Sequence, residues 1–322
     1  MATTGRTIFV KAVGYKALRN TPKEWAVPRI EEEIKFIFEK TSKVKDRHYP
    51  PLDKNIEDGS RCVFINDFKE LDNGGFIITV CSYVKGHVPE TFSPDMDGEK
   101  VDVSVMDLTD INGSPKEVVY TYRVLAFGQI MIVENCMGSG GVSGLQKLLR
   151  SLLKRLRPKG HPLIEFSDIA SDNLRQLIES KGGVKSVTAR IMHDVMGKAS
   201  IFGRKLTDMR RSVGGANKCM VAWEADSSEE IDADNAIAIL QEADENYLDS
   251  VSLTFNYGGG VSDLSEYREK KVVRIQITPE GSIAVTEVEA ELKGYLKELR
   301  KTSSRGPIKS DGTLRNVRKL GG

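Results

Sequence analysis

Hydrophobic and polar residues alternate along much of the first 135 residues, which is the pattern of half-buried β-strands. The clearest example is VDVSVMDL at residues 101–108. Further strands are predicted at residues 7–13, 61–66, 76–84, 118–125 and 128–135. The turn sequence Asp72-Asn73-Gly74-Gly75 separates two of these runs, and an Asn-Gly step in that position predicts a hairpin. An antiparallel sheet is therefore expected in this part of the chain.

One helical pattern interrupts these strands. Residues 28–44 carry three glutamates in the first turn and lysines at the end, an order that suits the helix dipole. Ile30, Ile34, Ile37 and Phe38 recur at helical spacing and predict the buried face. Together with the strands, this helix predicts an α+β unit.

The most amphipathic segment is LQKLLRSLLKRLR, residues 145–157. Its leucines fall on one helical face. The opposite face carries a cationic row without a single acid, made of Lys147, Arg150, Lys154 and Arg157. Helix surfaces gain from opposite charges at i,i+4, so an all-cationic row forgoes those pairs. The row is either an ordinary solvated face or a phosphate-binding face, and the missing acids favour phosphate binding.

After this helix the pattern alternates between strands and helices. We predict strands at residues 163–166, 184–192, 219–223, 251–255 and 272–277, with a further short strand at 282–285. Helices are predicted at residues 171–180, 231–246 and 287–301. Residues 306–322 are polar, basic and rich in turn residues, which predicts a flexible tail.

Two glycine-rich segments suggest a domain organisation. The first, MGSGGVSG, contains Gly138, Gly140, Gly141 and Gly144, and the second contains Gly214 and Gly215. Such segments are typical of hinges. We therefore expect an α+β fold in which a mixed or antiparallel-sheet domain, residues 1–137 and 216–305, carries an inserted smaller basic α/β domain, residues 138–215.

Composition places the chain among ordinary globular proteins. It has 322 residues, 39% hydrophobic and 29% charged. No apolar run has the length of a signal peptide or a membrane span. Four separate cysteines each lie in or beside an apolar run, so we expect buried free thiols and a reducing cytoplasm.

The charge is divided into blocks. From Lys147 to Arg211 there are 15 basic and 6 acidic residues, and from Cys219 to Tyr267 there are 12 acidic residues and no basic one. From Lys293 to the end there are 9 basic and 2 acidic residues. A basic block is the electrostatic signature of a polyanion partner, most often nucleic acid. The acidic block would keep DNA away from its own face or meet a second subunit.

The predicted DNA-binding residues extend beyond the cationic row through the whole basic block. Few aromatic side chains interleave with them, whereas single-strand binders need stacking platforms. This favours duplex DNA contacted through its backbone. The complete predicted set is Lys147, Arg150, Lys154, Arg155, Arg157, Lys159, Lys181, Lys185, Arg190, Lys198, Arg204, Lys205, Arg210 and Arg211.

No catalytic residue, metal ligand or cofactor is predicted. The glycine segment lacks the Gly-Lys-Ser/Thr of a Walker A loop and does not match GxGxxG. Glu291-Leu292-Lys293 has the ExK pattern of metal nucleases but lies in a helical pattern. The acidic residues 226–234 lack the glycine and ligand spacing of a calcium loop.

From residue 128 to 215 the chain resembles the RexA-like family of phage exclusion proteins. The resemblance rests on a strand ending in IVENCM, the Gly/Ser segment and the leucine-rich helix. It continues with strand–helix–strand in HPLIEFSDIASDNLRQLIESKGGVKSVTARI and the basic stretch SIFGRKLTDMRR. The chain is longer than that family, and its basic tail is a departure. The resemblance implies a two-domain homodimer without enzymatic activity, which binds duplex DNA, excludes superinfecting phages and acts with a membrane channel protein.

The sequence as a whole thus predicts a cytoplasmic, sequence-independent double-stranded DNA-binding protein. Two alternatives stay open. One is a metal-dependent nuclease or other defence enzyme, and the other is a protein-interaction subunit whose basic face meets an acidic partner or an anionic membrane.

Overall fold

The computed structural model describes most of the chain. The described residues are 2–22, 24–72, 74–92, 103–105, 108–110, 112–113, 116–169, 172–191, 208–209, 211–214, 218–226, 229–233, 235–237, 239, 250–262, 267–279, 281–301 and 308–314. Two compact units are formed. Unit 1 comprises Met1–Ile8, Val13–Phe166 and Val272–Gly294, and unit 2 comprises Phe9–Ala12, Ser167–Lys271 and Tyr295–Gly322.

The larger sheet has the strand order β14-β1-β8-β7-β4-β3-β2, with β9 also paired to β1. The pairs β2–β3, β3–β4, β4–β7 and β7–β8 are all antiparallel. A separate two-stranded sheet joins β5 to β6. These strands are β1 (Thr3–Lys16), β2 (His48–Tyr49), β3 (Arg61–Glu70), β4 (Phe76–Val84), β5 (Glu90–Phe92), β6 (Val103–Val105), β7 (Val119–Phe127), β8 (Ile130–Glu134), β9 (Leu163–Asp168) and β14 (Lys270–Gln276).

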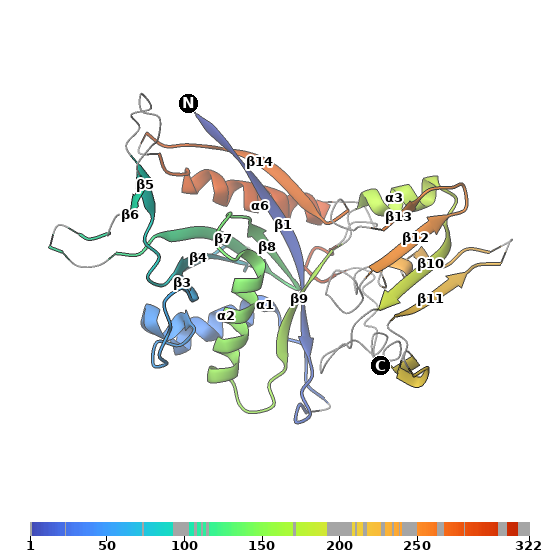
Figure 1. Ribbon diagram of the computed structural model, residues 1–322, viewed down its shortest axis with the longest axis horizontal. Coiled ribbons are helices and arrows are strands. Elements are labelled where there is room, and N and C mark those ends of the chain that lie inside the picture. The colour runs from blue at the N-terminus through green and yellow to red at the C-terminus, as the bar shows by residue number, and fades with distance from the viewer. Residues whose placement is uncertain are drawn as a thin grey trace. The chain divides into compact units, whose positions relative to one another are not determined.

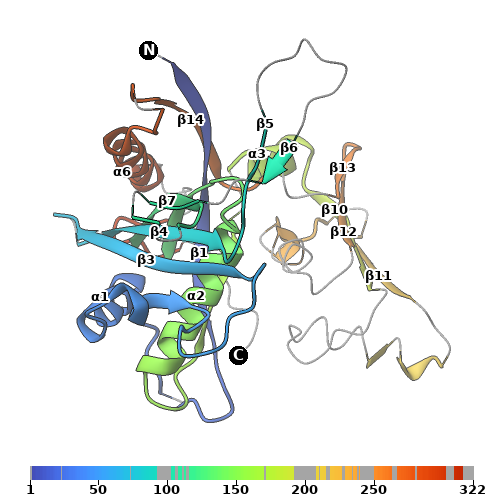
Figure 2. The same cartoon turned by 60° about the vertical axis from the view of Figure 1, so that its left-hand side comes forward.

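Two helices cover one side of this sheet in unit 1. They are α1 (Ile30–Lys40) and α2 (Gly141–Leu156), and the short 3₁₀ helix η1 (Val44–Arg47) follows α1. Both α1 and α2 lie on the same side of β3 and β4 (Figures 1 and 2). Their apolar faces join one core with the inward side chains of the strands, including Ile34, Leu148, Val80 and Tyr122. Burial of these apolar faces is the main stabilisation of unit 1.

Unit 2 has its own sheet and core. The strand order is β11-β10-β12-β13, antiparallel throughout. Leu174 and Ile178 of the adjacent helix pack with Val187 and Leu253 of the strands. The elements are α3 (Asp172–Ser180), β10 (Val184–Ile191), β11 (Cys219–Glu224), β12 (Ser250–Phe255) and β13 (Gly260–Val261). The last helix of the chain is α6 (Val285–Lys301).

The predicted α+β class with antiparallel sheets is confirmed. Local boundaries differ in places. β1 is longer than predicted at both ends, and α2 starts at Gly141, four residues earlier than the leucine pattern indicated. Only fragments of the predicted helix 231–246 lie within the described residues. In the predicted tail, Ile308 is buried and forms a β-bridge with Leu314, so residues 308–314 are a packed turn.

The two compact units do not follow the predicted domain boundaries. Residues 138–215 were expected to form one inserted basic domain. Instead α2 belongs to unit 1, because its leucines complete the core over the large sheet. β10 in turn pairs with β11 and β12, although the predicted boundary places β10 in the inserted domain and both β11 and β12 in the other domain. The leucine pattern shows that α2 buries one face but does not show which partner covers it.

Among the described residues, no helix combines the length and the apolar composition needed to cross a bilayer. The four cysteines are free thiols. Cys62, Cys81 and Cys136 are buried, as predicted, and Cys219 is half-buried.

Candidate nucleic-acid interface

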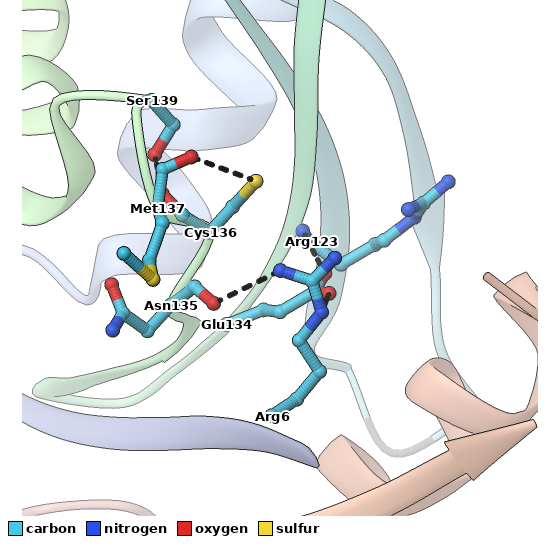
Figure 3. A network of polar contacts seen from close by, with 7 residues as sticks. All are labelled: Arg6, Arg123, Glu134, Asn135, Cys136, Met137 and Ser139. Carbon is cyan, nitrogen blue, oxygen red and sulfur yellow. Dashed lines mark hydrogen bonds and ion pairs between the residues drawn. The ribbon is translucent and has the colours of Figure 1, made fainter. Parts of the chain in front are cut away.

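The glycine segment before α2 is an ordered turn. The Ser139 hydroxyl donates to the Cys136 carbonyl oxygen at 2.7 Å, and the Gly141 amide donates to the Ser139 hydroxyl at 3.1 Å. Figure 3 shows this turn leaving the end of β8. Gly138 and Gly140 have φ angles of 83° and 75°, which favour glycine. The glycines therefore shape the entry into α2.

The same turn is tightly packed. A Cβ on Gly138 would lie 2.8 Å from the Tyr120 ring, and one on Gly140 would lie 2.7 Å from Arg61 Cδ. Arg61 also donates a hydrogen bond to the Gly138 carbonyl oxygen. Both flanks of the turn, Gly141 and Gly144 included, belong to unit 1. The predicted hinge is therefore not a crossing between the compact units. Gly214 lies in unit 2, and Gly215 lies outside the described residues.

A buried carboxylate lies at the end of β8, just before this turn. Glu134 is only 1% exposed. The Arg123 backbone amide donates to its Oε2 at 3.0 Å, and Arg6 Nε lies 3.8 Å from its Oε1 (Figure 3). Burial raises the pKa of Glu134, although the Arg123 amide and the Arg123 and Arg6 charges act in the opposite direction. These contacts join β1, β7 and β8 and are structural.

The cationic face of α2 lies opposite a fully buried leucine stripe. Leu145, Leu148, Leu149, Leu152 and Leu153 are all at most 2% exposed. On the other side Lys147, Lys154 and Arg155 are exposed, and Lys159 is exposed just beyond the helix end. The helix ends at Arg157, where the backbone is extended before Pro158. The amphipathic pattern thus placed Lys147 and Lys154 correctly on the surface, and Arg155 and Lys159 come from the wider predicted set.

Two members of the predicted cationic row contact protein instead. Arg150 donates from Nε to the Ile164 carbonyl oxygen at 2.7 Å and pairs through Nη2 with Glu165 at 3.0 Å. Arg157 donates from Nε and Nη2 to Glu33 Oε2 at 3.1 and 3.0 Å. Its guanidinium also lies 3.6 Å from the Phe36 ring centroid. Both side chains are engaged because their acidic partners come from β9 and α1, outside the helix itself.

Other cations join α2 from the N-terminal part of unit 1. Arg155 Nη2 donates to the Asp46 carbonyl oxygen in η1 at 2.8 Å, across 109 positions of sequence. Lys43 and Lys45, which flank the start of η1, are both exposed. Among the described residues, no lysine of this group forms an ion pair. We call the group the α2 basic surface, and its members are Lys43, Lys45, Lys147, Lys154, Arg155 and Lys159.

Sequence reasoning missed Lys43 and Lys45, although a signal was present. The segment KTSKVKDR, residues 40–47, holds four basic residues and one acid. The lysines after α1 were interpreted only as dipole partners of that helix.

The remaining predicted cations belong to unit 2, so the set is divided between the two units. Within unit 2 the antiparallel β10–β11 pair sets Ser186 opposite Glu224. Lys185 Nζ consequently lies 3.6 Å from Glu224. The basic and acidic blocks of the sequence therefore come together in space.

A pocket of about 930 Å³ next to this pair is mainly acidic. Lys185 shares its wall with the carboxylates of Glu224, Asp226, Glu229 and Glu230. Their field opposes phosphate binding at Lys185. Lys181 is half-buried next to Gly182, and Arg190 and Arg211 have further interactions within the protein. Lys198, Arg204, Lys205 and Arg210 lie outside the described residues.

In the part of the chain that the structure describes, no group of three His, Cys, Asp or Glu side chains is arranged to hold a metal ion. Glu291 and Lys293 lie in α6, a helix, as the sequence pattern indicated.

Comparison with protein-family models and with curated proteins finds no match. The resemblance to the RexA-like family therefore stays a prediction from the layout of the sequence.

Proposed function

We propose that the protein binds nucleic acid through the α2 basic surface, by neutralising backbone phosphates of duplex DNA with little sequence preference. The observation that carries this proposal is the hydrogen bond from Arg155 of α2 to the Asp46 carbonyl oxygen of η1, which joins two regions far apart in sequence that each carry exposed cations. None of the lysines of the α2 basic surface is paired with a carboxylate among the described residues. The positive charges of such a surface repel one another, and bound phosphates would reduce this repulsion.

The proposed interface is smaller than the predicted basic block. Arg150 and Arg157 are engaged with Glu165 and Glu33, and Lys185 faces Glu224. Four to six phosphate contacts then remain for the α2 basic surface. The logarithm of the binding constant should fall against log[salt] with a slope of roughly −4 to −5.

The test is fluorescence anisotropy of labelled duplexes of unrelated sequence, between about 50 and 200 mM salt. The double variant Lys154→Glu/Lys159→Glu should weaken binding at least about tenfold and reduce the slope by about 2. The matched control is Lys293→Glu/Lys297→Glu in α6, which changes the net charge equally and should change affinity by less than about twofold. Equal losses in both variants would show a nonspecific charge effect and contradict the assigned surface.

The same assay separates the alternative functions. Loss of DNA integrity with Mg²⁺ would favour a metal-dependent nuclease. Absence of duplex binding at low salt would instead favour an acidic protein partner or an anionic membrane.

The RexA-like resemblance would extend this proposal to a homodimer in the cytoplasm that acts in phage exclusion with a membrane channel protein. Light scattering of the purified chain tests the dimer. Plating efficiency of superinfecting phages on expressing and control cells tests the exclusion role.

A further inference from the structure

Two loops meet beside the α2 basic surface, one after β1 and one after α2. The Thr21 hydroxyl donates to the Gly160 carbonyl oxygen at 2.8 Å and accepts from the Leu18 amide at 2.8 Å. Gly160 lies so close to the other loop that a Cβ would be 2.5 Å from the Asn20 carbonyl oxygen. Arg19 and Lys159 are each next in sequence to a residue of this contact, and both are exposed.

An aromatic group lies in the same region. The Trp25 ring centroid is 5.2 Å from that of Tyr15 and 5.7 Å from that of His161, with interplanar angles of 60° and 75°. Neither ring stacks parallel to the indole. Trp25 is only half-buried, so part of the indole reaches the surface. Trp25 is therefore a half-buried aromatic side chain that packs against His161, which follows the exposed Lys159 closely in sequence.

This aromatic group is tied to the end of α2. His161 Nε2 lies 3.4 Å from Glu33 Oε1, and Glu33 Oε2 holds Arg157. Glu33 is 1% exposed, so the link is buried. These contacts fix the aromatic group to the C-terminal end of α2, which Lys159 follows in sequence.

Aromatic rings next to cations suit a single-stranded nucleic acid, because bases stack on the ring while phosphates contact the cations. An anionic membrane is the other surface that exposed apolar groups and cations could meet, and Leu18 and Val27 in this loop are 39% and 37% exposed. Membrane docking requires apolar side chains that penetrate the headgroup region. Trp25 packs edge-on against both Tyr15 and His161, whose own ring centroids are 6.4 Å apart, so the three rings form one cluster. Packing of this kind favours a stacked base over insertion into a membrane.

We infer that Trp25 stacks on an unpaired base of a DNA strand whose phosphates contact Lys159 and Arg19. The preferred ligand is then a duplex with a single-stranded extension, bound with the duplex on the α2 basic surface. This inference rests on the proposed function and narrows its substrate class.

The experiment uses the full chain with Trp223→Phe, which leaves Trp25 as the only tryptophan. A duplex with an extension of about five nucleotides should quench Trp25 emission by about half at saturation, whereas the blunt duplex should bind without comparable quenching. Adding Trp25→Ala should weaken binding of the extended duplex by about 5- to 100-fold and that of the blunt duplex by less than about twofold. Trp25→Phe is the conservative control, and should retain much of the preference and the thermal unfolding midpoint.

The outcomes separate this inference from the proposed function. If no DNA form binds, the proposed function fails. If blunt and extended duplexes bind equally and neither quenches Trp25, the surface binds duplex alone and the stacking inference is wrong. A blue shift of Trp25 emission with phosphatidylserine vesicles, and none with DNA, would overturn it in favour of a membrane.

Discussion

Arg157 donates two hydrogen bonds to a single oxygen of Glu33, from Nε at 3.1 Å and from Nη2 at 3.0 Å. The carboxylate is 1% exposed, and burial raises its pKa while Arg157 acts to lower it. This contact divides the cationic row of α2 into two kinds of residue. Lys147 and Lys154 face outward, while Arg157 neutralises a buried charge and fixes α1 against the end of α2.

Truncation of Arg157 should therefore destabilise the protein much more than truncation of Lys154, although both residues lie on the same helix face. Arg157→Ala leaves Glu33 without its main partner and should cost about 2–3 kcal/mol. Lys154→Ala should stay within about 0.5 kcal/mol of wild type, because the side chain is exposed and makes no ion pair among the described residues. Urea unfolding of both variants measures the difference. Equal, small effects would show that the Arg157–Glu33 contact contributes little.

The glycine turn before α2 gives a second prediction. Gly140→Ala adds a Cβ to a residue whose φ is 75°, and this Cβ would lie 2.7 Å from Arg61 Cδ. The substitution should destabilise the protein by about 1–2 kcal/mol. Gly5→Ala is the control, because Gly5 has open space around its Cβ position and no positive φ. Its effect should be within about 0.5 kcal/mol. If Gly140→Ala is harmless to stability but alters DNA association, the segment is a hinge after all.

Much of the fold could be predicted from local patterns. The strands of the large sheet, the hairpin of β3 and β4 and the leucine stripe of α2 depend on residues close in sequence, and the structure contains them. Residues 282–285, predicted as a strand, instead hold an isolated β-bridge at Ile283 and the start of α6. Domain boundaries could not be predicted in this way. A stripe such as Leu145–Leu153 must be buried, but its partners Ile34 and Tyr122 lie far from it in sequence and carry no local sign of the contact.

The candidate site was predictable only in part for the same reason. Solvent exposure of Lys147 and Lys154 follows from helical periodicity. The hydrogen bonds of Arg157 to Glu33 and of Arg155 to the Asp46 carbonyl oxygen follow from tertiary packing. The charge blocks were informative but incomplete, since antiparallel pairing of β10 with β11 brings Lys185 to Glu224 and reduces the net positive charge there.

The buried Glu134 predicts a specific pH dependence. Because its pKa is raised in the folded protein, the folded state binds this proton more tightly than the unfolded chain. The stabilisation from protonation is complete below the ordinary pKa of glutamate and is lost as pH rises through the raised value. Glu134→Gln removes this loss, so the free energy of unfolding of the variant relative to wild type should increase as the pH rises above the ordinary pKa of glutamate. Urea unfolding across that range measures it.

The control for Glu134 is Glu57→Gln, which makes the same change in net charge at an exposed position. Its difference from wild type should stay nearly constant across the series. A Glu134→Gln profile parallel to wild type would show that the carboxylate is ionised with its ordinary affinity for protons.

The last prediction tests the assignment of α2 to unit 1. Leu152 is fully buried in the core that contains Val80 and Tyr122, so Leu152→Ala should cost about 2–5 kcal/mol. The loss of stability should be greatest in the elements against which Leu152 packs. Hydrogen exchange should accelerate in β4 and β7, while the amides of β10 and β12 in unit 2 keep their protection. Acceleration confined to α2 and β10, with β4 and β7 unchanged, would mean that α2 forms a separate module with the segment that follows it, as the glycine-bounded pattern of the sequence indicated.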